Sequence, residues 1–127
     1  MTLLASSRVS VFLATAKADE ARVFYRDTLG LTMTEDNPYG LVFDLEGAEL
    51  RLSKVAGFTP FPWTVLDWHV QDIAATMKAL AAKGVEFTRF DGIDHDADGI
   101  WTTPDGKARI AWFRDPDDNV LSVSQRS

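Results

Sequence analysis

Hydrophobic and polar residues follow one order twice along the chain. Residues 9–14 form a short β-rich run, and from Ala18 onward the apolar residues recur at the three- and four-residue spacing of a helix, which Gly30 is placed to end. Three β-like runs follow, at residues 31–35, 39–45 and 49–55. The first half of the chain therefore predicts a strand, a helix and three more strands.

The same order restarts at Thr64. A β-rich run over residues 64–70 precedes a helical pattern that begins after Asp72, a favourable N-cap, and ends at Gly84. Three more β-like runs follow, at residues 85–90, 108–113 and 120–124. This repeat predicts two βαβββ modules, residues 8–55 and 64–125, joined by a linker at residues 56–63 within one domain of residues 1–127.

The second module carries an insertion of roughly sixteen residues relative to the first. It contains DHDADGIWTTPDG, residues 94–106, whose aspartates have the spacing of a calcium loop. Such a loop needs a flanking helix on each side and a bidentate Glu at its last position, whereas here the flanks are β-like and Asp105 takes that position. We therefore predict an acidic surface loop with His95 in solvent, which delivers Trp101 to a binding site.

Two short motifs mark corresponding places in the modules: FYRDTLGL at residues 24–31 and WFRDPDDNVLSV at residues 112–123. In this order and with the repeat, the chain resembles the vicinal oxygen chelate superfamily of glyoxalases, extradiol dioxygenases and bleomycin or fosfomycin resistance proteins. The resemblance covers residues 8–125. It implies an α+β fold in which two βαβββ modules form an open, cup-shaped mixed β-sheet barrel with helices outside, and a cavity between the half-cups for a ligand or a metal.

The resemblance also implies four metal-ligand positions, which fall on Ser10, Arg51, Val65 and Ser122. None suits a divalent metal, because neutral serine is a poor ligand, valine has no donor atom and arginine is a cation. A shift of two residues offers Glu49 for Arg51, and Asp67 or His69 for Val65, but nothing better for the two serines. We therefore expect no metal and no other cofactor.

Strand alternation predicts which side chains line the cavity, and places Trp63, Val65, Asp67 and His69 on one face. The candidate ligand contacts are aromatic residues with a few polar anchors: Phe12, Arg51, Phe58, Phe61, Trp63, Trp101 and Ser122. Two alternatives stay open, namely a buried ion pair between Arg51 and Asp67, and linker aromatics that contact a dimer partner instead of a ligand. Trp68 and Trp112 are predicted to be buried core residues.

Composition removes several classes of function. The chain has 127 residues, no cysteine and a net charge of −6, so disulfides, thiol nucleophiles and thiolate metal sites are excluded. It has no basic run for a nucleic-acid backbone and no apolar run that could span a membrane. The N-terminal residues lack the pattern of a signal peptide, so we expect a soluble, cytoplasmic protein.

Three functions fit these observations. We favour a metal-free, homodimeric binding protein that holds a flat or aromatic small molecule, such as a drug, between the half-cups, as the antibiotic resistance members of the resembled family do. The second is an enzyme of the same fold, a lyase, isomerase or dioxygenase, with Asp67 and His69 as acid-base residues. The third is a dimeric interaction module whose aromatic linker serves only dimerisation.

Overall fold

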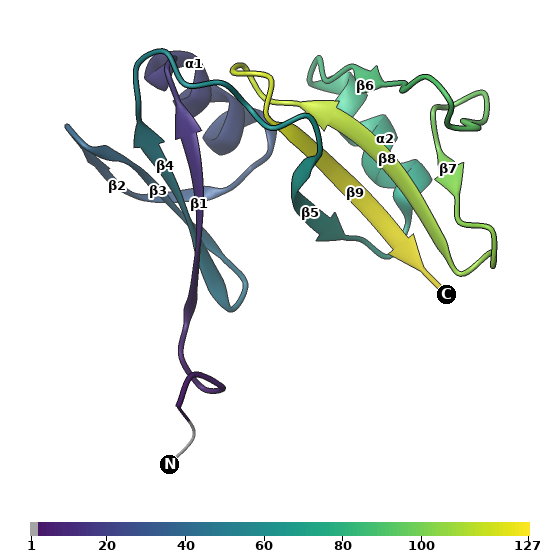
Figure 1. Cartoon of the computed structure of the whole chain (residues 1–127), viewed down its shortest axis with the longest axis horizontal. Helices are drawn as coiled ribbons and strands as arrows, with labels where there is room; N and C mark the ends of the chain where they lie inside the picture. The colour runs from purple at the N-terminus through teal and green to yellow at the C-terminus, as the bar shows by residue number, and fades with distance from the viewer. Residues whose placement is uncertain (1–2) are drawn as a thin grey trace. The chain divides into compact units, whose positions relative to one another are not determined.

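The computed structural model describes residues 3–127, which divide into two compact units between Thr59 and Pro60 (Figure 1). Each unit contains one sheet and one α-helix. The division falls inside the predicted linker, while the prediction that both modules form a single domain stays a prediction. No helix among residues 3–127 is both long enough and apolar enough to cross a membrane.

The first unit is a βαβββ module. Its elements are β1 (Val9–Thr15), α1 (Ala18–Val23), a π-helical turn η1 (Phe24–Thr28), β2 (Thr32–Asn37), β3 (Gly40–Leu45) and β4 (Ala48–Lys54). The strand order in the sheet is β1-β4-β3-β2, with β1 parallel to β4 and the other pairs antiparallel. This mixed sheet confirms the predicted element order and the α+β class.

One face of the first sheet packs against the helix. Because side chains alternate along a strand, the apolar residues at every second position point to this face. The buried set comprises Leu13, Ala21, Tyr25, Leu41, Phe43, Leu50 and Leu52. The ring of Tyr25 lies 5.6 Å from that of Phe43, so the helix and β3 meet at an aromatic contact.

The helix ends differently from the prediction. The backbone N–H of Leu29 donates to the carbonyl oxygen of Phe24 at 2.9 Å, five residues back, so the last turn is π-helical and the α-helix proper ends at Val23. Apolar residues at three- and four-residue spacing suit either kind of turn, which is why the sequence pattern did not show this. Gly30 ends the segment with a φ of +79°, as predicted.

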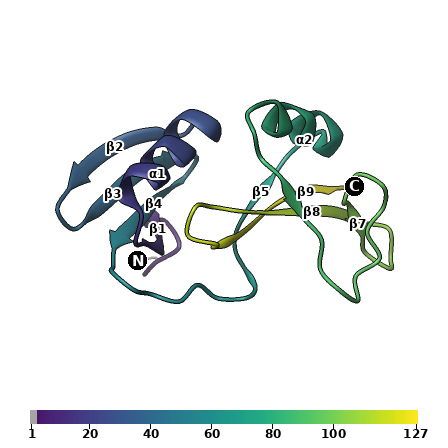
Figure 2. The ribbon, with the colours of Figure 1, turned by 90° about the horizontal axis from the view of Figure 1, so that it is seen from above.

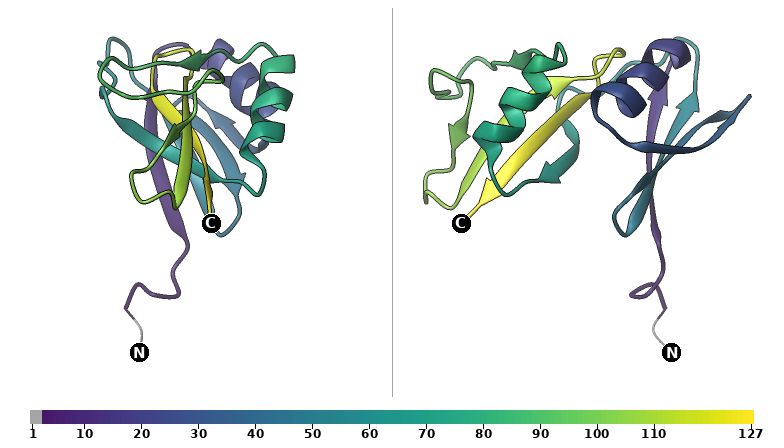
Figure 3. Two further views of the ribbon diagram at one scale, coloured as in Figure 1. Left: turned by 90° about the vertical axis from the view of Figure 1, so that its right-hand side faces the viewer. Right: turned by 180° about the vertical axis from the view of Figure 1, so that it is seen from behind.

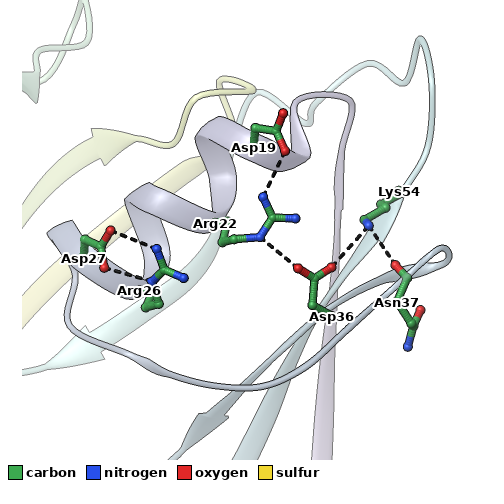
Figure 4. A network of polar contacts seen from close by, with 7 residues as sticks. All are labelled: Asp19, Arg22, Arg26, Asp27, Asp36, Asn37 and Lys54. Atoms are coloured by element: carbon green, nitrogen blue, oxygen red, sulfur yellow. Dashed lines mark hydrogen bonds and ion pairs between the residues drawn. The ribbon is translucent and has the colours of Figure 1, made fainter.

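Ion pairs connect the helix of the first unit to the far edge of its sheet (Figure 4). Arg22 donates to Asp19 and to Asp36, both at 2.9 Å, and Lys54 reaches Asp36 and the carbonyl of Asn37. The hydrogen bond from Arg22 holds the pKa of Asp36 below its ordinary value. This network joins α1, β2 and β4, so its role is structural.

The second unit repeats the module with one added strand. Its elements are β5 (Thr64–His69), α2 (Ile73–Ala82), β6 (Phe87–Thr88), β7 (Trp101–Thr102), β8 (Ala108–Arg114) and β9 (Val120–Arg126). The strand order is β5-β9-β8-β6, with β5 parallel to β9, and β7 pairs with β8 beside it (Figure 1). The predicted strand at residues 85–90 is shorter than expected, because only two residues pair with β8 before the insertion begins.

The helix α2 lies on one side of the second sheet (Figure 2). Asp72 caps it by accepting from the backbone N–H of Ala75 at 3.0 Å, and Gly84 follows it with a φ of +95°. Both were predicted from the sequence. The buried residues under this helix are Ile73, Met77, Ala111, Phe113, Leu121 and Val123.

A tight turn joins β8 to β9, which run side by side (Figure 3). The Asp115 carboxylate accepts from the backbone N–H groups of Asp117 and Asn119, each at 2.9 Å, and from the Asn119 side chain at 2.8 Å. Asp115 and Asn119 are buried, and Asp118 takes the left-handed conformation with a φ of +68°. The DPDDN motif therefore builds the hairpin that sets the register of β9.

The insertion is flanked by strands β6 and β7, so the helices that a calcium loop requires are replaced by β-structure, as predicted. Asp96 accepts from the backbone N–H groups of Asp98 and Ile100, each at 2.9 Å, and its carboxylate closes the turn. Within residues 3–127, no group of three or more His, Cys, Asp or Glu side chains is arranged to hold a metal ion.

Candidate functional site

The face of the second sheet turned away from α2, which we name the helix-distal face, carries a row of polar and aromatic residues. Ala111 and Phe113 are buried on the α2 side, so Trp112 between them points to the helix-distal face. Trp112 was predicted to be a buried core residue, and this prediction is wrong because the side chain is half-buried on the opposite face. The run RIAWF is almost wholly apolar, so its sequence showed no alternation.

Asp67, Ser122 and Trp112 form one row across the three neighbouring strands of this face. Asp67 is paired in register with Ser122 of β9, and Ser122 with Trp112 of β8. His69 and Ser124 form the next pair along, so Asp67 and His69 share a face as predicted. The register shifts between Thr64 and Leu66, so simple alternation does not assign Val65 to a face, and its predicted position stays a prediction.

Two buried hydroxyl groups hold the Asp67 carboxylate. Ser122 Oγ donates to Oδ1 at 2.6 Å and Ser124 Oγ donates to Oδ2 at 2.7 Å. The Asp67 side chain is 28% exposed, and His69, which is 60% exposed, places Nε2 at 3.4 Å from Oδ2. The carboxylate is therefore fixed in place by neutral donors and faces outward from the sheet.

The indole of Trp112 crosses the sheet. Its Nε1–H donates to the hydroxyl of Thr64 on β5 at 2.9 Å, although Trp112 itself belongs to β8. Since β9 lies between these two strands, the ring spans β9 and ends at the strand that carries Asp67. This places a flat apolar surface beside the carboxylate.

Three more rings surround Trp112 and make what we name the aromatic wall: Phe90, His95, Trp101 and Trp112. The ring centroid of Trp112 lies 5.5 Å from Phe90, 5.7 Å from His95 and 6.2 Å from Trp101. Trp101 lies in β7 opposite Ile110 and is half-buried. The insertion therefore does bring Trp101 to the site, from a short strand that follows the loop.

His95 holds the insertion against the wall. Its Nε2 accepts from the backbone N–H of Phe90 at 2.9 Å, and its Nδ1 lies 2.8 Å from the carbonyl oxygen of Gly99. These partners require the neutral ring with its proton on Nδ1. The prediction that His95 is solvated is wrong, because both ring nitrogens are bonded to backbone and the ring contacts Trp112.

The helix-distal face of the first sheet is lined by ion pairs. Arg51 Nε donates to Glu49 Oε2 at 2.6 Å, and the Ser10 hydroxyl donates to the same oxygen at 3.1 Å. These bonds, from Arg51 first, hold the pKa of Glu49 below its ordinary value. Within their own units, Arg51 pairs with Glu49 and Asp67 accepts from serine hydroxyls, and the ion pair considered between Arg51 and Asp67 stays a prediction.

A pocket of about 290 Å³ lies on the same face of the first sheet. Phe12, Tyr39, Val42 and Arg51 contribute to its lining, and Phe12 is 66% exposed. The predicted ligand contacts Phe12 and Arg51 therefore share one pocket. Its one cationic side chain is already paired with Glu49.

The aromatic residues of the predicted linker remain accessible. Phe61 and Trp63 stack with ring centroids 5.0 Å apart and an interplanar angle of 14°, and both are exposed. Phe58 is half-buried. Their contact with a ligand or with a dimer partner stays a prediction.

Solved structures of other proteins match this chain over nearly its whole length. A glyoxalase/bleomycin resistance protein from Catenulispora acidiphila has a TM-score of 0.70 at 20% identity, covering 94% of this chain and 98% of that chain. Lactoylglutathione lyase from Agrobacterium tumefaciens has a TM-score of 0.72 at 19% identity, covering 97% and 96%. The chain therefore has the glyoxalase fold.

A third structure with the glyoxalase fold is TnmS3, an antibiotic-binding protein from Streptomyces sp. CB03234. It has a TM-score of 0.70 at 26% identity and covers 98% of this chain and 100% of its own. A scan against protein-family models and a search of curated protein sequences both find no match. The likeness to known proteins is therefore one of structure.

The four positions at which the glyoxalase fold implies metal ligands do not fit a divalent cation here. Ser10 Oγ donates to Glu49 and Ser122 Oγ donates to Asp67, so both hydroxyls are already directed at carboxylates. Arg51 brings a positive charge, and Val65 has no donor atom. No reaction step is assigned to a metal at these positions.

Sequence reasoning found part of this site. Asp67, His69, Ser122 and Trp101 were candidates, and alternation with Ser122 puts Ser124 on the same face, where it lies opposite His69. Phe90, His95 and Trp112 were missed as parts of the site. Trp68, predicted to be buried under α2, does stack on Phe113 on that side but is only half-buried.

Proposed function

We propose that this protein binds a flat, aromatic small molecule against the aromatic wall of its second unit. The observation that carries the proposal is the row Asp67, Ser122 and Trp112, which sets a fixed polar anchor beside a broad ring surface. Binding sites for small molecules have this composition, mostly apolar walls with a few placed polar groups. The ligand would stack on Trp112 and Trp101.

The wall suits stacking energetically. Each well-placed aromatic contact contributes roughly 1 kcal/mol beyond the burial of apolar area. Trp101 and Trp112 are inclined at 32° to one another, so one flat ligand can contact both rings. The antibiotic-binding TnmS3 has the same fold, and we propose that sequestration of an antibiotic or a similar drug is the role of this chain as well.

The test is a binding titration by calorimetry with a panel of planar aromatic compounds. Trp101→Ala should weaken binding roughly thirtyfold, about 2 kcal/mol, as expected for a central interface aromatic. The melting temperature should stay close to that of the unchanged protein. Trp68→Phe, on the α2 side of the same sheet, is the matched control and should bind as the unchanged protein does.

Two results would refute the proposal. One is a panel in which no planar compound binds. The other is a folded Trp101→Ala variant that binds every compound as well as the unchanged protein does. Failure of Trp101→Ala to fold would show that Trp101 is a core residue, and Trp112→Val then tests the same wall.

An enzyme of the same fold is the second candidate. Asp67 and His69 favour it, because these two titratable groups lie together on the helix-distal face with Nε2 at 3.4 Å from Oδ2. Metal analysis of the purified protein separates the candidates. Near-stoichiometric metal would support the enzyme and contradict the metal-free binding protein.

We also propose a homodimer. Two exposed, stacked aromatic rings, Phe61 and Trp63, are a large apolar surface for a linker in water, and a second copy of the chain would cover them. Sedimentation at tens of micromolar tests the proposal, as does the double variant Phe61→Ser, Trp63→Ser, which should shift the protein toward monomer. A monomer alone in the unchanged protein would contradict it.

A further inference from the structure

We infer that the ligand of the aromatic wall is a cation: a planar aromatic molecule whose positively charged N–H group pairs with Asp67 while its rings lie on Trp112. This inference rests on the proposed function and names the chemical class of the ligand. Three observations carry it: the negative charge of Asp67, the position of the Trp112 ring, and the orientation of the arginine side chains of this unit.

The charge of Asp67 is not neutralised by its neighbours in the second unit. Both oxygens accept from serine hydroxyls, which are neutral donors and suit the ionised carboxylate, an acceptor at each oxygen. Within residues 60–127 the only ion-pair partner of Asp67 is His69, whose Nε2 lies 3.4 Å from Oδ2. His69 carries a positive charge only when it is protonated. A carboxylate that is mostly withdrawn from water gains most from a ligand that brings a positive charge.

The distance between the anchor and the wall fits such a ligand. Asp67 and Trp112 lie on strands separated by β9, so their backbones are roughly 10 Å apart, two strand spacings. The indole extends back over β9 to Thr64, which brings the ring close to the Asp67 strand. An amino group attached directly to two or three fused rings, and sharing the delocalised charge of a protonated ring nitrogen, would reach Asp67 while the rings cover Trp112.

By strand alternation two arginines share the helix-distal face, and neither pairs with Asp67. Arg126 lies at the end of β9 opposite Ala108, four residues beyond Ser122. Arg114 places its guanidinium over the ring of Phe90, 5.8 Å from the centroid, on the β6 side of β8, which makes the Phe90 end unfavourable for a ligand cation. The net charge of −6 further favours the approach of cations.

The first unit offers a matched control for this carboxylate. Glu49 also lies on a helix-distal face and also accepts from a serine, but Arg51 neutralises it at 2.6 Å. A cationic ligand gains nothing from a carboxylate that already has its counter-ion. Glu49→Gln should therefore leave ligand binding unchanged, while Asp67→Asn removes the charge and keeps a side chain of the same size.

The experiment compares three acridines of similar shape by calorimetry at pH 8: 9-aminoacridine as the cation, acridine as the neutral compound and acridine-9-carboxylate as the anion. The unchanged protein should bind the cation about tenfold more tightly than the neutral compound, and the anion most weakly. Asp67→Asn should bring the cation to the affinity of the neutral compound, whose own affinity should not change. Glu49→Gln should reproduce the unchanged protein.

A second measurement needs no variant and covers the case in which Asp67→Asn does not fold. Raising the salt concentration screens the ion pair, so the affinity for the cation should fall while that for the neutral compound stays constant. Equal affinity for all three acridines, with no salt dependence, would refute the cation preference and leave the proposed binding function standing. Absence of binding by all three would refute the proposed function, and this inference with it.

Discussion

The two sheets of this protein share a strand order and differ in the row that crosses the middle of their helix-distal faces. In the first sheet this row is Phe12, Arg51 and Val42. In the second sheet the corresponding row is Asp67, Ser122 and Trp112. The aromatic ring of the row therefore belongs to the edge strand β1 in the first sheet and to the inner strand β8 in the second. The charged residue is the cation Arg51 in the first row and the anion Asp67 in the second.

The opposite faces of the two sheets remain alike. Phe43 and Phe113 occupy corresponding positions, and both are fully buried against the helix side of their sheets. Each unit must bury one apolar sheet face against its helix in order to fold. The helix-distal faces need no such apolar surface, so they can differ. We assign ligand binding to the second unit, whose carboxylate Asp67 has no arginine or lysine partner within that unit and lies beside the aromatic wall.

The largest expected effects are on the free energy of unfolding, and they test whether the helix-facing sides of the two sheets are packed equally well. Phe43→Ala and Phe113→Ala should each lower the free energy of unfolding by about 3 to 5 kcal/mol, because each leaves a cavity in a close-packed interior. Urea denaturation followed by circular dichroism measures both. A loss below about 1 kcal/mol in one variant alone would show that the two units are not packed equivalently.

The next effect tests the difference between the helix-distal faces. Trp112→Val gives the second sheet the residue that the first sheet has at the corresponding position. It should weaken binding of a planar ligand by at least about tenfold, since one side of the stacking surface is lost. Val42→Ala in the first unit should leave the affinity unchanged in the same titration, and an equal loss in both variants would place the ligand elsewhere.

A smaller effect concerns the insertion, which the first unit lacks. His95→Ala removes two hydrogen bonds to backbone, to Phe90 and Gly99, and should lower the free energy of unfolding by about 1 to 2 kcal/mol. Tryptophan emission should shift to longer wavelength as water reaches Trp101 and Trp112. His69→Ala, whose ring is 60% exposed, is the control and should change neither property. An unshifted emission spectrum in His95→Ala would count against the proposed role of His95.

The smallest effect depends on pH and compares two carboxylates: Asp36, which has an ion-pair partner, and Asp105, which has only neutral hydrogen-bond donors. Arg22 lowers the pKa of Asp36, so this ion pair stabilises the folded state above the unfolded pKa of Asp36, and the contribution is lost as the pH falls through the folded pKa. Asp36→Asn should therefore lower the melting temperature slightly at pH 7 and not at pH 2. The pKa of Asp105 is also lowered, chiefly by the hydroxyl of Thr103.

The stability effects of Asp36→Asn and Asp105→Asn should respond differently to salt. High salt should abolish the effect of Asp36→Asn at pH 7, because it screens the charge of Arg22. Asp105→Asn should keep its effect in high salt, since Asp105 is held by a hydroxyl and a backbone N–H. A difference that grows toward acid pH in Asp36→Asn would contradict the assigned sign.

Local sequence patterns were enough to predict the order of the elements, the cap of the second helix and the glycines that follow the two helical segments. Alternation placed Asp67 and His69 on one face, Asp72 and the two helix-ending glycines marked the helix boundaries, and both motifs lie in the segments expected from the family resemblance. These features depend on residues close together in the chain, where backbone geometry and capping act directly. Local patterns were therefore sufficient for them.

The assembly of the site depends on contacts between segments that are distant in the sequence. His95 was expected in solvent because acids surround it in the sequence, yet its environment comes from Phe90, Gly99 and a ring on another strand. Trp112 lies in a run where nearly every residue is apolar, so its face depends on the partners of β8 and on Thr64, which is far away in the chain. A side chain's neighbours across a sheet are set by strand order and register, which hydrophobic alternation within one strand does not specify.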